Sequence, residues 1–211
     1  AIPPLVELLT SGTAVAKEKA AAALLILAFN NSDNQVAIAK AGAIPPLVEL
    51  LTSGTAEAKE IAVVALWNLA FNNSDNQVAI VKAGAIPPLV ELLTSGIADA
   101  KEKAAAALRN LAFGNSDNKA AIAKAGAIPP LVELLTSRTA DAKENAAAAL
   151  RNLAFGNSDN QVAIAKAGAI PPLVELLTSG TAYAKENAAA ALRNLAFGNS
   201  DNQVAIAKAG A

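Results

Sequence analysis

The chain has 211 residues with 17 Lys and Arg against 18 Asp and Glu, and it contains neither His nor Cys. A formal net charge of −1 gives no basic footprint for nucleic acid or for anionic lipid, so neither is expected as a partner. Without His and Cys there is no disulfide framework and no thiolate chemistry, and the commonest metal ligand and general base are missing, so no metal or cofactor is expected.

The sequence repeats with a period of 42 residues. The five units are nearly identical and start at Ile2, Ile44, Ile86, Ile128 and Ile170. Each unit has room for three helices and shows no strand pattern. Such a repeat predicts an all-α solenoid, in which every unit buries its apolar faces against its neighbours.

The first predicted helix of a unit runs from Pro45 to Leu51. Two prolines suit a helix start, where the missing N–H groups would be unpaired in any case. Gly54 is expected to end the helix in a left-handed conformation. Arg138 stands at the equivalent place in the fourth unit, where it should cost about 1 kcal/mol if that conformation is left-handed.

The second predicted helix is long, from Ala56 to Phe71, with Thr55 as its N-cap. Ala62, Leu66 and Leu69 share one face at helical spacing and should form its buried stripe.

A short third helix is predicted from Asp75 to Ala83. Ser74 followed by Gln77 has the spacing of a capping box, and only the third unit loses it, through Lys119. Gly84 should stop this helix.

Two runs carry a family resemblance: 162–177 reads VAIAKAGAIPPLVELL and 191–196 reads ALRNLA. The chain resembles the armadillo repeat over its whole length. The resemblance implies a right-handed superhelix of about five three-helix repeats, forming a single solenoid over 1–211. The first unit would lack its short helix, and the last short helix, 201–209, would be unpaired. The near-identity of the units indicates a consensus or engineered array, or a recent natural duplication.

Armadillo proteins such as importin alpha and beta-catenin bind extended peptides in a concave groove. The resemblance places the groove asparagines of the family at Asn68, Asn110, Asn152 and Asn194, next to Trp67, Arg109, Arg151 and Arg193. A carboxamide offers donors and an acceptor together, so it suits the C=O and N–H groups of a peptide backbone.

The groove departs from the family pattern at two places. The family often carries Trp four residues before the groove Asn, where this chain has Val64, Ala106, Ala148 and Ala190. Seven residues before it, where importin-like grooves favour acids, stand Ile61, Lys103, Asn145 and Asn187. These departures argue against a receptor for basic nuclear-localisation signals.

Glutamate and arginine recur seven residues apart on the long helix, as Glu102/Arg109, Glu144/Arg151 and Glu186/Arg193. One interpretation is recognition of mixed-charge peptides, with Arg gripping carboxylates. The favoured interpretation is a solvated face with weak ion pairs to neighbouring units. Carboxylates occur in identical copies and not as one acid/base pair, so no enzyme is expected.

Both ends carry apolar residues without a polar cap. Six residues form these predicted association surfaces: Ile2, Leu5, Leu25, Ile26, Val204 and Ile206. Head-to-tail association into a homo-oligomer is the expectation, with sequence drift in a terminal unit as the alternative.

Two functions remain open: an engineered or consensus-derived scaffold that self-associates, which the uniform alanine-lined groove favours, and a natural fragment that acts as a peptide-binding adaptor. The absence of Met indicates a processed, excised or engineered chain. No signal-peptide pattern opens it, and the strongest apolar run, 20–29, is too short to span a bilayer, so a cytoplasmic protein is predicted.

Overall fold

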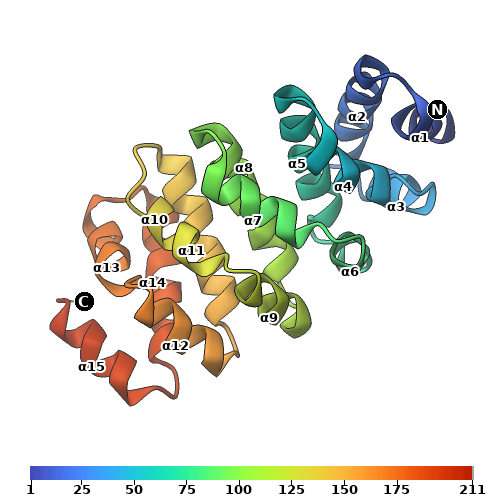
Figure 1. The fold of residues 1–211 in the computed structure, drawn as a ribbon. Helices are drawn as coiled ribbons and strands as arrows, with labels where there is room; N and C mark the ends of the chain where they lie inside the picture. Colours follow the sequence, from blue (N-terminus) through green and yellow to red (C-terminus); the bar gives the residue numbers. More distant parts are fainter. Residues whose placement is uncertain (211) are drawn as a thin grey trace. The chain divides into compact units, whose positions relative to one another are not determined.

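The structure is a computed structural model that describes residues 1–210, and these residues form fifteen α-helices and no strand (Figure 1). The helices follow a cycle of three. The Ile-Pro-Pro helices are α1 (Ile2–Ser11), α4 (Ile44–Ser53), α7 (Ile86–Ser95), α10 (Ile128–Leu134) and α13 (Ile170–Ser179). The long helices are α2 (Ala14–Ala28), α5 (Ala56–Ala70), α8 (Ala98–Ala112), α11 (Ala140–Ala154) and α14 (Ala182–Ala196). The short helices are α3 (Ser32–Lys40), α6 (Ser74–Lys82), α9 (Ser116–Lys124), α12 (Ser158–Lys166) and α15 (Ser200–Lys208).

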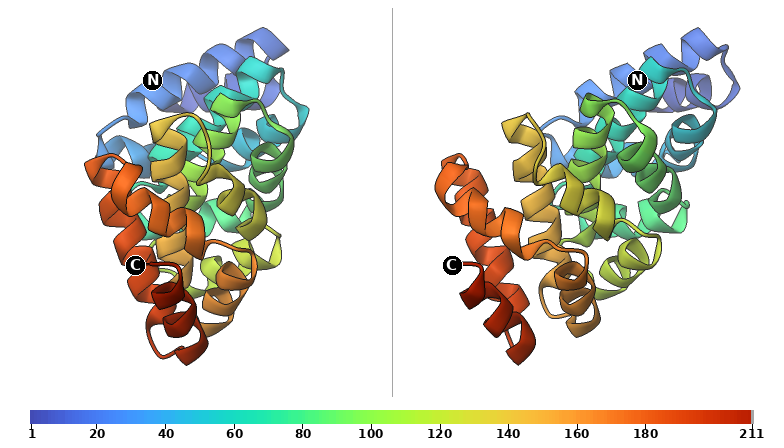
Figure 2. Two further views of the ribbon diagram at one scale, coloured as in Figure 1. Left: turned by 90° about the vertical axis from the view of Figure 1, so that its left-hand side faces the viewer. Right: turned by 60° about the vertical axis from the view of Figure 1, so that its left-hand side comes forward.

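The chain divides into two compact units, Ala1–Leu92 and Leu93–Ala211. In the first unit the long helices α2 and α5 pack side by side. In the second, α8, α11 and α14 form a row in which each packs on the next (Figure 2). Each unit therefore has the predicted solenoid arrangement of stacked helices.

Alanine and leucine fill the contacts between the long helices. The predicted stripe of Ala62, Leu66 and Leu69 is fully buried, and so are the four consecutive alanines 146–149 of α11. Small side chains let neighbouring helix backbones approach closely, while the leucines supply most of the apolar area removed from water. The sequence prediction of this core is confirmed.

Threonine begins four of the five long helices, as predicted. The Thr55 hydroxyl accepts a hydrogen bond from the backbone N–H of Ala58 at 3.1 Å, and Thr13, Thr139 and Thr181 do the same in their repeats. Ile97 occupies this position before α8 and provides no side-chain cap. Its side chain is 68% exposed, so it gains little from packing in exchange.

Replacing Ile97 with Thr should therefore stabilise the protein by about 1 kcal/mol, the usual contribution of an N-cap hydroxyl. Chemical denaturation followed by circular dichroism measures this gain. The reverse change in a sister helix, Thr55→Ile, should lower stability by a similar amount, because the only side-chain hydrogen bond of Thr55 among the described residues is its cap bond to Ala58. Equal stability of Ile97→Thr and the parent chain would contradict the capping argument.

The capping box predicted for the short helices is wrong. Asn73 is the N-cap of α6, with its side-chain oxygen accepting from the backbone N–H of Asn76 at 3.0 Å. Ser74 is already the first helical residue, and the Gln77 amide donates instead to the carbonyl oxygen of Ala70 at 3.0 Å. The glutamine thus joins the short helix to the end of the preceding long helix.

Gly84 ends α6 as predicted. It has φ = +85°, and the backbone N–H groups of Gly84 and Ala85 donate to the carbonyls of Val81 and Ile80. This is the Schellman pattern, which requires a left-handed residue.

Gly54, in contrast, is not left-handed: it has φ = −75° and ψ = 163°. Its Cα is crowded, because a Cβ there would lie 2.6 Å from the carbonyl oxygen of Leu50. Glycine is therefore favoured at position 54 because a side chain would clash with the Leu50 carbonyl oxygen, and not because the backbone is left-handed.

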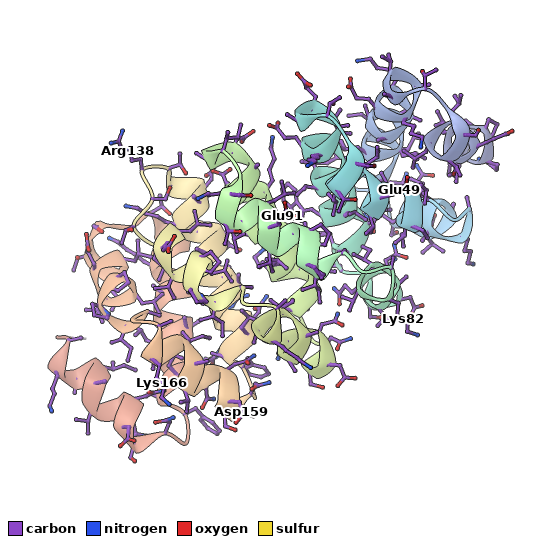
Figure 3. All side chains as sticks on the ribbon, in the orientation of Figure 1. Glu49, Lys82, Glu91, Arg138, Asp159 and Lys166 are labelled. Atoms are coloured by element: carbon purple, nitrogen blue, oxygen red, sulfur yellow. The ribbon has the colours of Figure 1, made fainter. Side chains whose placement is uncertain are left out.

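Arg138 shows how the fourth repeat avoids that clash. Helix α10 has seven residues where α4 has ten, and Arg138 lies on the loop to α11 with its side chain directed away from the helices (Figure 3). Arg138 is not among the described non-glycine residues with positive φ, so the left-handed conformation assumed for this position, and with it the expected cost of about 1 kcal/mol, is wrong.

Within residues 1–210, no single helix is long and apolar enough to cross a membrane; three pairs of consecutive helices, each bent by 81°, meet that test by length and composition only. The same residues contain no cluster of three or more Asp or Glu side chains placed to hold a metal ion.

Candidate binding groove

An open hollow on the row of long helices in the second unit brings several predicted groove residues together. Its volume is about 410 Å³, and Asn152 and Arg151 of α11 line it together with Asn194 and Arg193 of α14. The remaining lining residues are Ala112, Phe113, Gly114, Lys119, Phe155 and Ala190.

The two asparagines already make bonds between repeats. The Nδ2 atom of Asn152 donates to the carbonyl oxygen of Arg109 at 2.9 Å, and that of Asn194 donates to the carbonyl oxygen of Arg151 at 3.0 Å. Both side chains are buried apart from the edge that meets the hollow. Because a carboxamide carries two N–H donors, each amide keeps one donor outside these bonds. The asparagines therefore tie adjacent long helices together as well as line the hollow.

Each arginine lies against the asparagine that follows it in the sequence. Arg151 donates to the Asn152 side-chain oxygen from Nε and Nη2, at 3.2 and 3.1 Å. Arg193 makes one such bond to Asn194, at 3.4 Å. The two arginines thus donate to the side-chain oxygens of Asn152 and Asn194, which are the acceptor atoms of these amides.

Arg109 is held differently. Its Nη1 atom donates to the side-chain oxygen of Asn145 in the next repeat at 2.9 Å, and its Nε atom donates to Asn110 at 3.4 Å. Burial lowers the pKa of the Arg109 guanidinium from its ordinary value, although the group stays protonated near neutral pH.

The ion pairs expected between repeats are not formed by the glutamates in the arginine pattern. The Thr139 hydroxyl donates to Glu102 at 3.2 Å, and the Thr181 hydroxyl donates to Glu144. Burial raises the pKa of the Glu102 carboxyl, opposed by its Thr139 hydrogen bond. Within residues 1–210, Arg109, Arg151 and Arg193 make no ion pair with a carboxylate.

Lys119 is the site residue that the sequence prediction missed. The other four short helices carry Gln at this position, and those side chains bond to the preceding long helix of their own repeat. Lys119 instead reaches the next repeat, where its Nζ atom donates to the Phe155 carbonyl oxygen at 2.7 Å and lies 5.0 Å from the centre of the Phe155 ring. Its side chain is only 6% exposed, and burial lowers the pKa of its ammonium group. The sequence did carry a signal for this residue, because Lys119 replaces the glutamine that the other four repeats have at the same position.

Phenylalanines were also missed. One ends each long helix, and Phe113 and Phe155 contribute aromatic surface to the hollow. All five such residues are exposed: Phe29, Phe71, Phe113, Phe155 and Phe197.

The remaining predicted groove residues lie in the first unit. Asn68 on α5 is buried, and its side chain makes no hydrogen bond with other residues that the structure describes. Trp67 beside it is half-buried.

The sequence model of the armadillo/beta-catenin-like repeat matches four segments, 31–71, 73–113, 115–155 and 157–197. Each segment contains one short, one Ile-Pro-Pro and one long helix in that order. The chain belongs to the armadillo repeat family. Helices α1 and α2 precede the first matched armadillo repeat, and α15 follows the last.

Solved structures of designed armadillo proteins are similar to this chain. The designed armadillo repeat protein YIII(Dq)4CqI has a TM-score of 0.93 and 34% identity, over 100% of this chain and 88% of that one. Computationally designed armadillo repeat proteins for modular peptide recognition give a TM-score of 0.92, with 34% identity and the same coverage. The designed protein YIII(Dq.V1)4CPAF, in complex with the peptide (KR)4, gives a TM-score of 0.90 and 32% identity, over 99% of this chain and 87% of that one. No curated protein matches the sequence. The near-identical repeats and these similarities make the chain a consensus-like armadillo array of the engineered type.

The terminal helices of this armadillo array expose positions that its inner repeats bury. Leu5 and Ile2 are half-buried in α1, whereas Leu47 and Ile44 at the same positions of α4 are buried. Ile206 is half-buried in α15, whereas its four counterparts are fully buried: Ile38, Ile80, Ile122 and Ile164. Ile26 is 70% and Val204 53% exposed, and Leu25 is half-buried.

Proposed function

We propose that this chain is a non-enzymatic scaffold that binds an extended peptide along the long helices of its second unit. The observation that carries the proposal is the repeated geometry of Asn152 and Asn194, two buried carboxamides at the edge of one open hollow. Each has a donor that the protein leaves unused, and a repeated donor at the stacking interval suits successive carbonyls of an extended chain. Phe113 and Phe155 add apolar surface on which peptide side chains can pack.

The comparisons support binding in preference to catalysis. Designed armadillo proteins of the same fold include one made for modular peptide recognition and one in complex with a peptide. The alternative, a fragment of a natural adaptor, would use the same groove, so one experiment addresses both.

The test is selection of peptides from a random display library against the intact chain, followed by affinity measurement with fluorescence anisotropy. Replacing Asn152 and Asn194 together with Ala should weaken the selected peptide about tenfold or more, because two backbone hydrogen bonds are lost. The matched control is Lys166→Ala on α12, an exposed residue outside the hollow (Figure 3). Circular dichroism confirms that the double variant is folded. Undiminished binding by that folded variant would refute the groove assignment.

We also propose that the 211-residue chain by itself associates head to tail, with α15 of one copy against α1 and α2 of the next. Inner short helices supply the pattern for this contact: the Asn76 and Asn202 amides donate to carbonyls of the preceding short helix, at Gln35 and Gln161. Among the described residues the Asn34 amide of α3 donates only to the Leu27 carbonyl, so the Gln203 carbonyl of α15 in another copy, the counterpart of Gln35 and Gln161, would complete its bonding. The same contact would also remove from water the apolar side chains that both ends expose, which favours association.

Light scattering over a range of protein concentrations tests the association. The mass should rise above 21.2 kDa with concentration, and Ile206→Lys should return it to that value, because the inner counterparts of Ile206 are fully buried and a buried ammonium is costly. Lys208→Gln, a change at an exposed position of the same helix, is the control. A mass of one chain at every concentration would remove the proposal.

A further inference from the structure

The hollow on α11 and α14 has an excess of positive charge. Its ten lining residues include Lys119, Arg151 and Arg193 and no acidic residue. The chain as a whole is close to neutral, with a formal net charge of −1, so this local excess does not follow from composition. Among the described residues, the side chains of Arg151 and Arg193 donate hydrogen bonds only to the neutral side-chain oxygens of Asn152 and Asn194.

Of these three cations, Lys119 is the one whose burial costs the most free energy, because its side chain is almost completely buried. A buried ammonium loses its hydration, and a carbonyl oxygen and an aromatic face compensate only part of that loss. The other four repeats keep a neutral glutamine at the same place, so the fold does not require a cation there. A carboxylate arriving in the hollow would supply the missing opposite charge.

A second possible hydrogen-bond acceptor for Arg151 is the side-chain oxygen of Asn187, as the equivalent arginine one repeat earlier shows. Arg109 bonds to Asn145 in the following repeat, and Asn187 holds the same position relative to Arg151. The side-chain oxygen of Asn187 is fully buried and has no hydrogen-bond partner. The Arg151 guanidinium therefore has an alternative to Asn152, and its turning away would free the Asn152 oxygen for a peptide N–H.

We propose that the hollow binds a carboxylate side chain, Glu or Asp, of an extended peptide, so the groove selects acidic and not basic peptides. The inference rests on the proposed peptide-binding function and adds the chemical class of the ligand. Arg151 and Arg193 donate charge-assisted bonds to the carboxylate, and these exceed in strength the bonds to the neutral Asn152 and Asn194. Binding of the acidic side chain and release of the Asn152 oxygen are then one event, which couples side-chain to backbone recognition.

The test uses the intact chain and three fluorescent octapeptides in which Ala alternates with Glu, with Gln or with Lys. Fluorescence anisotropy at fixed ionic strength gives each affinity. The Glu peptide should bind about tenfold tighter than the Gln peptide, and the Lys peptide weakest of the three. Lys119→Gln, which installs the residue of the other four repeats, should reduce the Glu-to-Gln ratio severalfold. Lys124→Gln removes the same charge from an exposed site on the same helix and should leave the ratio unchanged.

The possible failures are distinguishable. Equal affinity for all three peptides would leave backbone recognition in place and overturn the acidic specificity. Binding of none of them, together with no display-selected peptide, would overturn the proposed function and this inference with it. A Glu preference that Lys119→Gln and Lys124→Gln reduce equally would reflect general charge and would also overturn the assignment to the hollow.

Discussion

Shortening Leu173 to Ala is expected to lower the free energy of unfolding of the second unit by about 3 kcal/mol or more. Leu173 is fully buried in α13, a helix that packs against α14 and α15. The change removes apolar atoms from the core and leaves a cavity that the surrounding helices fill only partly. In a solenoid each repeat is supported by its neighbours, so the loss should be concentrated in the repeats around α13.

Leu5→Ala is the matched control, because α1 has the same local sequence as α13. Leu5 is only half-buried, so its truncation should cost about 1 kcal/mol. Urea denaturation at low protein concentration measures both losses, and hydrogen exchange locates them. Equal losses at the two sites would mean that the end of the chain is as well covered as its interior. A Leu5 loss that grows with concentration would instead support head-to-tail association.

The regular features of the fold were predictable because each has a local cause. Hydrophobic spacing placed Leu66 and Leu69 in the core, Thr55 fixed the start of the long helix, and Gly84 fixed the left-handed end of the short helix. Repetition then carried these local causes to every unit.

The errors arose where two residues compete or where steric space decides. Asn73 and Ser74 are both good N-caps, and the sequence does not show which one the backbone selects. Gly54 resembles a left-handed cap in sequence, but the limiting factor is the nearby Leu50 carbonyl oxygen, which becomes visible only once the helix is built.

The candidate site was predicted in part. The asparagine and arginine positions followed from the family resemblance, and Asn152, Asn194, Arg151 and Arg193 line one hollow. Their mutual hydrogen bonds depend on how successive long helices stack, which no single repeat encodes. Lys119 joins the site by reaching Phe155, 36 positions along the chain, and only the stacking brings these two residues together.

A second row of asparagines, on the short helices, was not predicted at all. The Asn160 amide donates to the carbonyl oxygens of Leu153 at 3.0 Å and Lys119 at 3.4 Å. It therefore joins α12 both to the end of α11 and to the preceding short helix, α9. Asn76 and Asn202 make the same pair of bonds, so this is a regular element of the stack.

Asn160→Ala should destabilise the second unit by about 2 kcal/mol, because it leaves a buried carbonyl at Leu153 without its side-chain donor and removes the link to α9. Asn34→Ala provides the comparison, since Asn34 is half-buried and, within residues 1–210, its side-chain amide donates only to the Leu27 carbonyl. Its loss should stay below about 1 kcal/mol. Chemical denaturation measures the two values in the same chain.

The same substitution also tests how the stack positions the hollow. Because Asn160 bonds to the backbone of Lys119, its loss should speed hydrogen exchange in α9 as well as in α12, and it should weaken binding of a Glu-containing peptide more than that of a neutral one. Faster exchange confined to α12, with unchanged peptide selectivity, would mean that Lys119 is held in place by Phe155 alone. The buried asparagines would then stabilise the repeats without organising the surface that faces the ligand.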